Sequence, residues 1–129
     1  MAVSDKWASD LVSFEAELSR AVLIKFHPAG TASIRGIFDH EIGHQLDALL
    51  DLRKDKEIRD IIDSMTDKEL TENLSQYSWD NAASKDRGDR YQEAIAEAWS
   101  EYCNNPNCRC AAKAIGERIE YIYDQKFGR

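Results

Sequence analysis

The feature that most constrains this chain is a pair of histidines four residues apart, His40 and His44, with Glu41 directly after the first, in the pattern HExxH. Side chains at positions i and i+4 share one face of an α-helix, so a helix lets both imidazoles reach a single metal ion. Imidazole nitrogen is a preferred ligand of zinc. Glu41 is then placed to accept a proton from a water molecule that the metal activates. The motif therefore predicts a helix and a zinc site together.

The residues around the motif favour such a helix. Thr31 or Ser33 can cap a helix that runs to about Asp51. Its large apolar residues form one stripe, made of Ile34, Phe38, Ile42, Leu46 and Leu49. The centre of this stripe lies about 160° around the helix from both histidines, so we expect the stripe to face the core and the histidines to face a cleft. Asp47 shares the histidine face, where it either orients a ligand histidine or is a solvated helix acid.

A catalytic zinc site has three protein ligands and one open position, so a third ligand is needed. His27 is the only other histidine, and its sequence context predicts a turn. The carboxylate candidates are spaced four residues apart in one segment and are Glu93, Glu97 and Glu101. Such spacing alone is typical of a solvated helix face. The alanines between these acids, however, would let this helix approach the HExxH helix closely, so that one acid could bind the metal and another could hold a histidine.

The rest of the chain predicts a mostly helical domain. Apolar spacing and capping signals predict helices over about 4–20, 56–65 and 89–103, a short one beginning at 66, and a last one over about 108–123. The partly β-branched run 21–26 precedes the turn signal at 27–30 and predicts a strand, whereas 77–88 is polar and predicts a loop. We therefore expect an α+β fold, mostly helical, with a small β-sheet beside the HExxH helix.

Composition limits the classes of function. A chain of 129 residues predicts one domain, spanning 1–129, with a core that needs no disulfides. The three cysteines, Cys103, Cys108 and Cys110, lack the paired spacing of a zinc ribbon, and their odd number is typical of free thiols in a reducing compartment. The net charge of −7 argues against a nucleic-acid partner. Without a long apolar run or a signal-peptide pattern, we expect no membrane association and a cytoplasmic location.

The segments HEIGHQLD, LSQYS and YQEAIAEAWSEY occur in this order. Together they resemble the zinc metallopeptidase domain of anthrax lethal factor and its relatives, which include domains attached to phage minor head proteins and to bacterial effectors. The resemblance covers about 26–102 and implies a zincin-like domain that binds one zinc ion. It implies His40 and His44 as ligands, Glu41 as general base, Glu93 as third ligand, and Glu97 as a support behind the site.

A tyrosine role also follows from the resemblance. Tyr77 matches a family tyrosine that can donate a hydrogen bond to the oxyanion of the tetrahedral intermediate. Residues 79–90 look like an insertion relative to the family pattern, so Tyr91 is an alternative for this role. Ile95 stands where the family pattern has an aromatic residue, which should alter local packing.

Four functional hypotheses follow. The first is an endopeptidase whose predicted strand pairs with an extended peptide or protein substrate.

The second is a non-catalytic, zinc-stabilised phage head-associated structural or interaction module within a larger phage protein. It would have phage structural proteins as partners and a virion-associated location. The retained Glu41 argues against it, because a structural site needs no base. The third, a peptide deformylase, would need a cysteine before the motif. The fourth, a helical interaction domain with a chance motif, would bind no metal.

Overall fold

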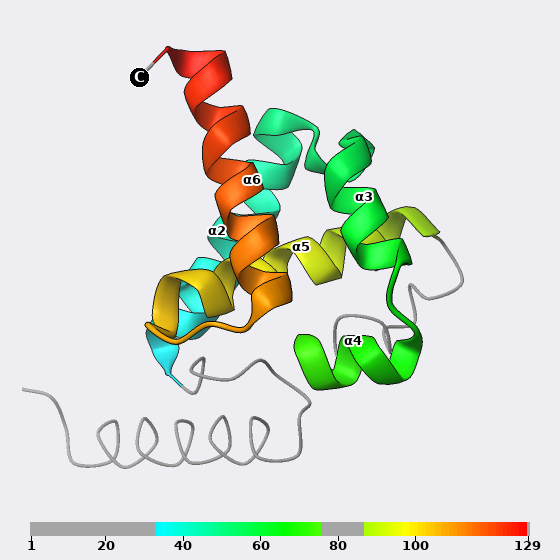
Figure 1. Cartoon of the computed structure of the whole chain (residues 1–129). Helices are drawn as coiled ribbons and strands as arrows, with labels where there is room; N and C mark the ends of the chain where they lie inside the picture. The colour runs from blue at the N-terminus through cyan, green and yellow to red at the C-terminus, as the bar shows by residue number, and fades with distance from the viewer. Residues whose placement is uncertain (1–32, 76–86, 129) are drawn as a thin grey trace, which may run out of the picture.

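In the computed structural model of the chain, residues 33–75 and 87–128 are described, and they form a helical assembly (Figure 1). The elements are α2 (Ile34–Leu50), the 3-10 helix η1 (Leu52–Lys54), α3 (Lys56–Asp63), α4 (Asp67–Asn73), α5 (Arg87–Asn104) and α6 (Cys110–Phe127). The most extensive contact joins α2 to α5, and the next joins α5 to α6. Helix α5 is therefore the central element, which both neighbours cross.

The predicted α+β fold with a small β-sheet beside the HExxH helix is wrong, because every regular element in 33–75 and 87–128 is helical and no strand occurs there. The physical reason is that, within these residues, α2 makes its contacts mainly with other helices, α5 above all and η1 next, so helices stand where the sheet was expected. The helix predicted at 4–20 and the strand predicted at 21–26 lie outside the described residues, and so do His27 and Tyr77.

Local capping signals place the helix ends as predicted. Ser33, rather than Thr31, caps α2, and its side chain accepts a hydrogen bond from a backbone N–H of the first turn at 3.0 Å. Thr66 caps α4 by accepting a hydrogen bond from the backbone N–H of Glu69 at 3.2 Å. Helix α2 ends at Asp51, whose φ of 53° is the left-handed conformation that commonly ends a helix. These ends agree with the sequence because caps depend on neighbouring residues only.

The prediction that the apolar stripe of α2 faces the core is wrong. Ile34, Phe38 and Leu49 are 44%, 65% and 49% exposed. The other two stripe residues are half-buried and line an apolar hollow of about 300 Å³ between α2, α5 and α6. The buried face of α2 instead carries small and polar residues together with one leucine, namely Gly36, Asp39, Gly43, Asp47 and Leu50. Two acids can be buried there because each has a partner: Asn104 donates to Asp39 at 2.8 Å, and Arg53 pairs with Asp47.

Helices α2 and α5 cross at Gly43 and Ala96. A Cβ atom added to Gly43 would lie 2.8 Å from the Cα of Ala96, well inside the roughly 3.5–4.0 Å at which carbon atoms normally touch. The prediction that small residues of α5 allow a close approach is confirmed at Ala96. The histidines lie at positions −3 and +1 from Gly43, and Glu93 and Glu97 lie at −3 and +1 from Ala96. The crossing thus sets the two pairs against each other.

The main core lies on the other sides of α5. Its fully buried members include Leu52, Ile58, Ile62, Leu70, Leu74, Ile95, Ile115 and Ile119. Ile58 and Ile62 are the residues that α3 contributes to this set. Among the described helices, none has both the length and the apolar character that crossing a membrane requires.

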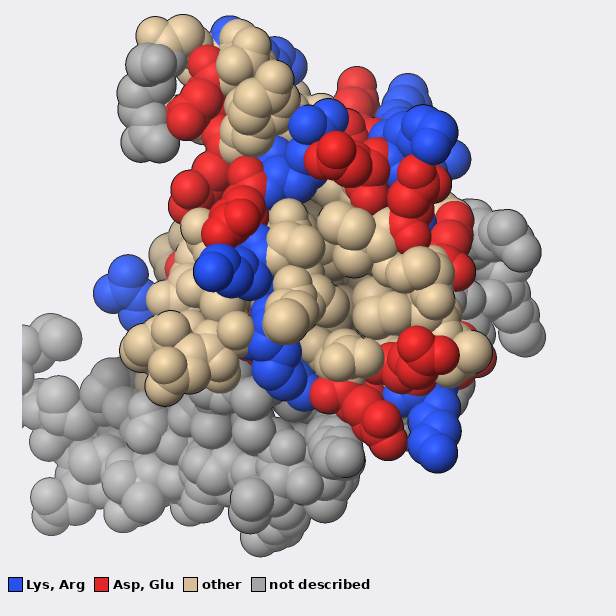
Figure 2. All heavy atoms as spheres, viewed as in Figure 1, with Lys and Arg blue, Asp and Glu red and all other residues tan. Residues whose placement is uncertain are grey.

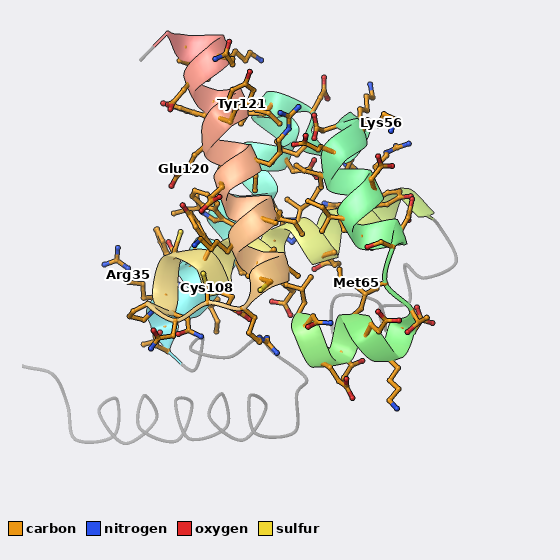
Figure 3. All side chains as sticks on the ribbon, in the orientation of Figure 1. Arg35, Lys56, Met65, Cys108, Glu120 and Tyr121 are labelled. Carbon is orange, nitrogen blue, oxygen red and sulfur yellow. The ribbon has the colours of Figure 1, made fainter. Side chains whose placement is uncertain are left out.

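Most charged residues lie at the periphery. Figure 2 shows acidic and basic side chains interspersed around an area without charged residues on the visible face. In Figure 3, Arg35 and Lys56 extend away from the helices, in agreement with side-chain exposures of 82% and 89%. The acids on the inner faces of α2 and α5 are therefore exceptions in this molecule that need a physical explanation.

We expect Gly43→Ala to lower the free energy of unfolding by about 1–3 kcal/mol, because the added methyl group overpacks the helix crossing. We expect this loss of stability even though alanine favours a helix over glycine by about 1 kcal/mol. Urea unfolding measures the change, with Gln45→Ala on the exposed side of α2 as a control that should shift it by less than about 0.5 kcal/mol. A Gly43→Ala variant as stable as the native chain would contradict the close crossing.

Candidate metal centre

The three predicted ligands converge across the α2–α5 crossing. His40 Nε2 and His44 Nε2 lie 3.1 Å apart. The carboxylate of Glu93 lies beside both, with Oε2 at 3.4 Å from His40 Nε2 and Oε1 at 3.5 Å from His44 Nε2. Within the described part of the chain, these residues form the one group of three or more side chains arranged to hold a metal ion.

Two helices provide these ligands. His40 and His44 stand on successive turns of α2 with their rings edge to face, at a centroid distance of 4.8 Å. Glu93 reaches them from α5. The three side chains are 14–17% exposed. The centre is therefore mostly enclosed by protein but keeps contact with solvent, as a site that uses water requires.

The chemistry of the donor set fits zinc. If neither of the two Nε2 atoms carried a proton, their lone pairs would face each other at 3.1 Å. A proton or a metal ion is therefore needed between them. Glu93 Oε2 is buried, and its contact with His40 lacks the alignment of a hydrogen bond. Two imidazoles and one carboxylate match a known ligand set of catalytic zinc. A bound ion would satisfy all three groups at once.

Glu97, for which the resemblance implies a role behind the site, contacts His40 at Nδ1, whereas Glu93 lies beside Nε2 of the same ring. The side chain of Glu97 is 2% exposed, and its Oε2 lies 3.0 Å from His40 Nδ1. Its other oxygen, Oε1, accepts a hydrogen bond from the hydroxyl of Ser75 at 2.9 Å. Because a carboxylate accepts hydrogen bonds, this contact places a proton on Nδ1 and leaves Nε2 to face the metal position.

The charges of the centre are strongly coupled. Burial opposes a positive charge on His40, but the close contacts and the negative charges of Glu93 and Glu97 outweigh this effect and raise the pKa of His40 to about 9. Burial likewise opposes the charge on Glu93, but the contacts with His40 and His44 lower the pKa of Glu93 to about 2. At neutral pH without metal, the site thus holds a proton between two carboxylates, and metal binding must release that proton.

Glu41 and Asp47 occupy different sides of α2. Glu41 is exposed, one position after His40. Asp47 is buried, accepts a hydrogen bond from the backbone N–H of Arg53 at 3.0 Å, and pairs with the Arg53 side chain at 3.0 Å. Burial raises the pKa of this carboxyl group, against the opposing contacts of Arg53. Asp47 therefore joins α2 to η1, and its predicted role beside a histidine stays a prediction.

The remaining candidates have structural partners. Glu101 is fully buried and binds the guanidinium and the backbone N–H of Arg109, the latter at 2.8 Å. The acids of α5 thus do not form a solvated face. Tyr91 is 5% exposed and donates its hydroxyl to Asp63 at 2.7 Å, which disfavours it as the oxyanion donor. Tyr77, the preferred donor, lies outside the described residues.

Ser75 and Arg109 are the residues of the site region that the sequence analysis missed. Ser75 stands in LSQYS, where only the tyrosine carried an expectation, and Arg109 stands in the cysteine cluster, where only the thiols were considered. A single polar residue after a helix end has no periodicity that could reveal its partner. The three cysteines are free thiols, exposed or half-buried.

No protein-family model, curated protein or solved structure matches the chain. The resemblance to lethal-factor-like peptidases is therefore untested by these comparisons. The geometry of the candidate metal centre is therefore the main support for a function.

We expect the metal-free protein to lose stability as the pH rises from 6.5 to 9. The pKa of His40 is raised from 6.5 to about 9 on folding, so its contribution is complete below pH 6.5 and is lost as the pH approaches 9. The loss should be of order 1–3 kcal/mol. Glu93 has the opposite sign, and its contribution is lost as the pH falls from 4.5 toward 2.

Urea unfolding in the presence of a chelator measures this dependence. The His40→Gln variant serves as the comparison and should lack most of the alkaline decline. An equal decline in both proteins would show that the charge of His40 is not stabilised by the two carboxylates.

Proposed function

We propose that this chain is a zinc-dependent metallopeptidase in which His40, His44 and Glu93 bind one zinc ion and Glu41 is the general base. The observation that carries the proposal is the convergence of two imidazole Nε2 atoms and one carboxylate from α2 and α5, all within 4.8 Å of one another. Glu41, the acid that would act on water, directly follows His40 in the chain and is exposed.

The arrangement assigns a task to each side chain. A bound zinc ion would polarise the substrate carbonyl and lower the pKa of the attacking water. Glu41 would accept the proton of that water and return it to the leaving amine. Glu97 would keep His40 in the tautomer whose Nε2 faces the metal. Tyr77 would donate to the developing oxyanion, as the resemblance implies.

The number of ligands and the exposure of the site, together with the presence of Glu41, favour catalysis over a purely structural metal. Structural zinc sites are closed by four protein ligands, whereas residues 33–75 and 87–128 bring three together here. The fourth position would then be available to water or substrate. The centre is also partly exposed, which gives a peptide access to it.

We expect the native chain, purified without metal and then exchanged with zinc, to hold about one zinc ion by elemental analysis, and Glu93→Gln to lose it. The matched control is Glu117→Gln, an acid on α6 that is 58% exposed and pairs only at the surface with Lys113. Glu101 is unsuitable as a control because it is buried against Arg109. Equal zinc content in Glu93→Gln and Glu117→Gln would refute the ligand assignment.

We expect Glu41→Gln to keep the zinc content of the native chain but to reduce peptide hydrolysis by about 10²–10⁴-fold, since it removes the proton acceptor without removing a ligand. Cleavage of an unfolded protein substrate, followed by mass spectrometry, measures the effect. A chelator should abolish the native activity, and added zinc should restore it. Stoichiometric zinc with no hydrolysis in the native chain would instead identify a structural metal site.

A further inference from the structure

Ser75 connects the metal centre to a distant part of the fold. Helix α4 ends at Asn73, Leu74 is its C-terminal cap, and Ser75 follows as a fully buried residue. Its hydroxyl donates to Glu97 Oε1 at 2.9 Å, while the other oxygen of the same carboxylate holds His40 at 3.0 Å. One carboxylate therefore links Ser75 directly to a predicted metal ligand.

The ion pair between half-buried Arg109 and fully buried Glu101 holds the backbone next to Ser75. The guanidinium of Arg109 donates to the carbonyl oxygen of Leu74 at 2.7 Å and also to that of Glu72. Arg109 is itself fixed by Glu101, which is fully buried on α5 and binds both its side chain and its backbone N–H. The planar guanidinium can make these contacts together because its donors point in fixed directions. The position of Ser75 is thus tied to α5, the helix that carries Glu93 and Glu97.

We infer that Ser75 is a positioning residue of the metal centre: its hydroxyl orients the Glu97 carboxylate that holds His40, and the Glu101–Arg109 pair keeps Ser75 in place. The inference rests on the proposed function, because the orientation of His40 matters only if His40 binds zinc. The terminal torsion of a glutamate is broad and only weakly restricted. A donor on each oxygen restricts the plane of the carboxylate, and so restricts the ring of His40.

The chain offers a matched control in Ser100. This serine is 1% exposed, and its hydroxyl donates to the backbone oxygen of Gly36 at 2.7 Å. Ser100 stands on α5 and contacts α2, but its acceptor is a backbone carbonyl. The acceptor of Ser75 is instead Glu97, the residue that contacts His40. Replacing either serine by alanine removes one buried hydroxyl and one hydrogen bond, so a general loss of packing should affect both variants alike.

The experiment compares Ser75→Ala, Ser75→Thr and Ser100→Ala with the native full-length chain. Zinc dissociation constants are measured by competition with a chromophoric chelator, and visible spectra are recorded after substitution with Co²⁺. We expect Ser75→Ala to weaken zinc binding about 10–100-fold and to change the Co²⁺ spectrum, as loss of a group behind a ligand does. Ser75→Thr, which keeps the hydroxyl, should bind zinc like the native chain. Ser100→Ala should keep both the affinity and the spectrum.

A second variant guards against loss of folding in Ser75→Ala. Arg109→Lys keeps a positive charge beside Glu101 but cannot bind the carboxylate and two carbonyl groups together, so it should weaken zinc binding in the same direction. Equal zinc affinities in the native chain, Ser75→Ala and Arg109→Lys would overturn the inference while leaving the peptidase proposal intact. A native chain that binds no zinc would overturn the proposed function, and the inference with it.

Discussion

The geometry of the candidate metal centre depends on the contact between Gly43 and Ala96. At this point α2 and α5 approach so closely that a β-carbon on Gly43 would lie 2.8 Å from the backbone of Ala96. Because the histidines and the glutamates stand at equal offsets from these two residues, the crossing alone sets imidazoles against carboxylates. A larger residue at either position would separate the helices and move the ligands apart, whatever else the chain retained.

The acids of α5 show how charge is accommodated in the interior. Each one is more buried than an unpaired carboxylate could be, and each has a different partner: Glu93 faces the two histidines, Glu97 binds His40 and Ser75, and Glu101 binds Arg109. Only Glu101 has a permanently charged partner among these contacts. The other two depend on a proton, or on a metal ion, in the histidine pair. Glu93 and Glu97 are thus two mostly buried acids that need a positive charge beside them, which a proton on His40 or a bound metal ion can supply. Their negative charges account for the raised pKa of His40.

The apolar stripe of α2 shows where periodicity was misleading. Large side chains such as Phe38 define a clear stripe, yet Phe38 is 65% exposed, while Gly43 and Asp47 are buried. Hydrophobicity predicts which face gains from burial, but a close helix crossing needs small residues, and partners such as Arg53 offset part of the cost of burying an acid. The polar, histidine-bearing side of α2 is therefore the side that packs.

The sequence by itself determined the local features: the cap at Thr66, a cap at Thr31 or Ser33, the helix that carries HExxH, and the presence of both histidines on one face. These follow from hydrogen bonds and spacing within a few residues. Only the tertiary structure decided which acids meet the histidines, how Glu101 is used, and that Ser75 stands behind Glu97. His40 and Glu97 are 57 residues apart, and helical periodicity holds no information about how two such distant helices cross. The crossing is decided by which side chains can be buried together, and that is a property of the packed molecule.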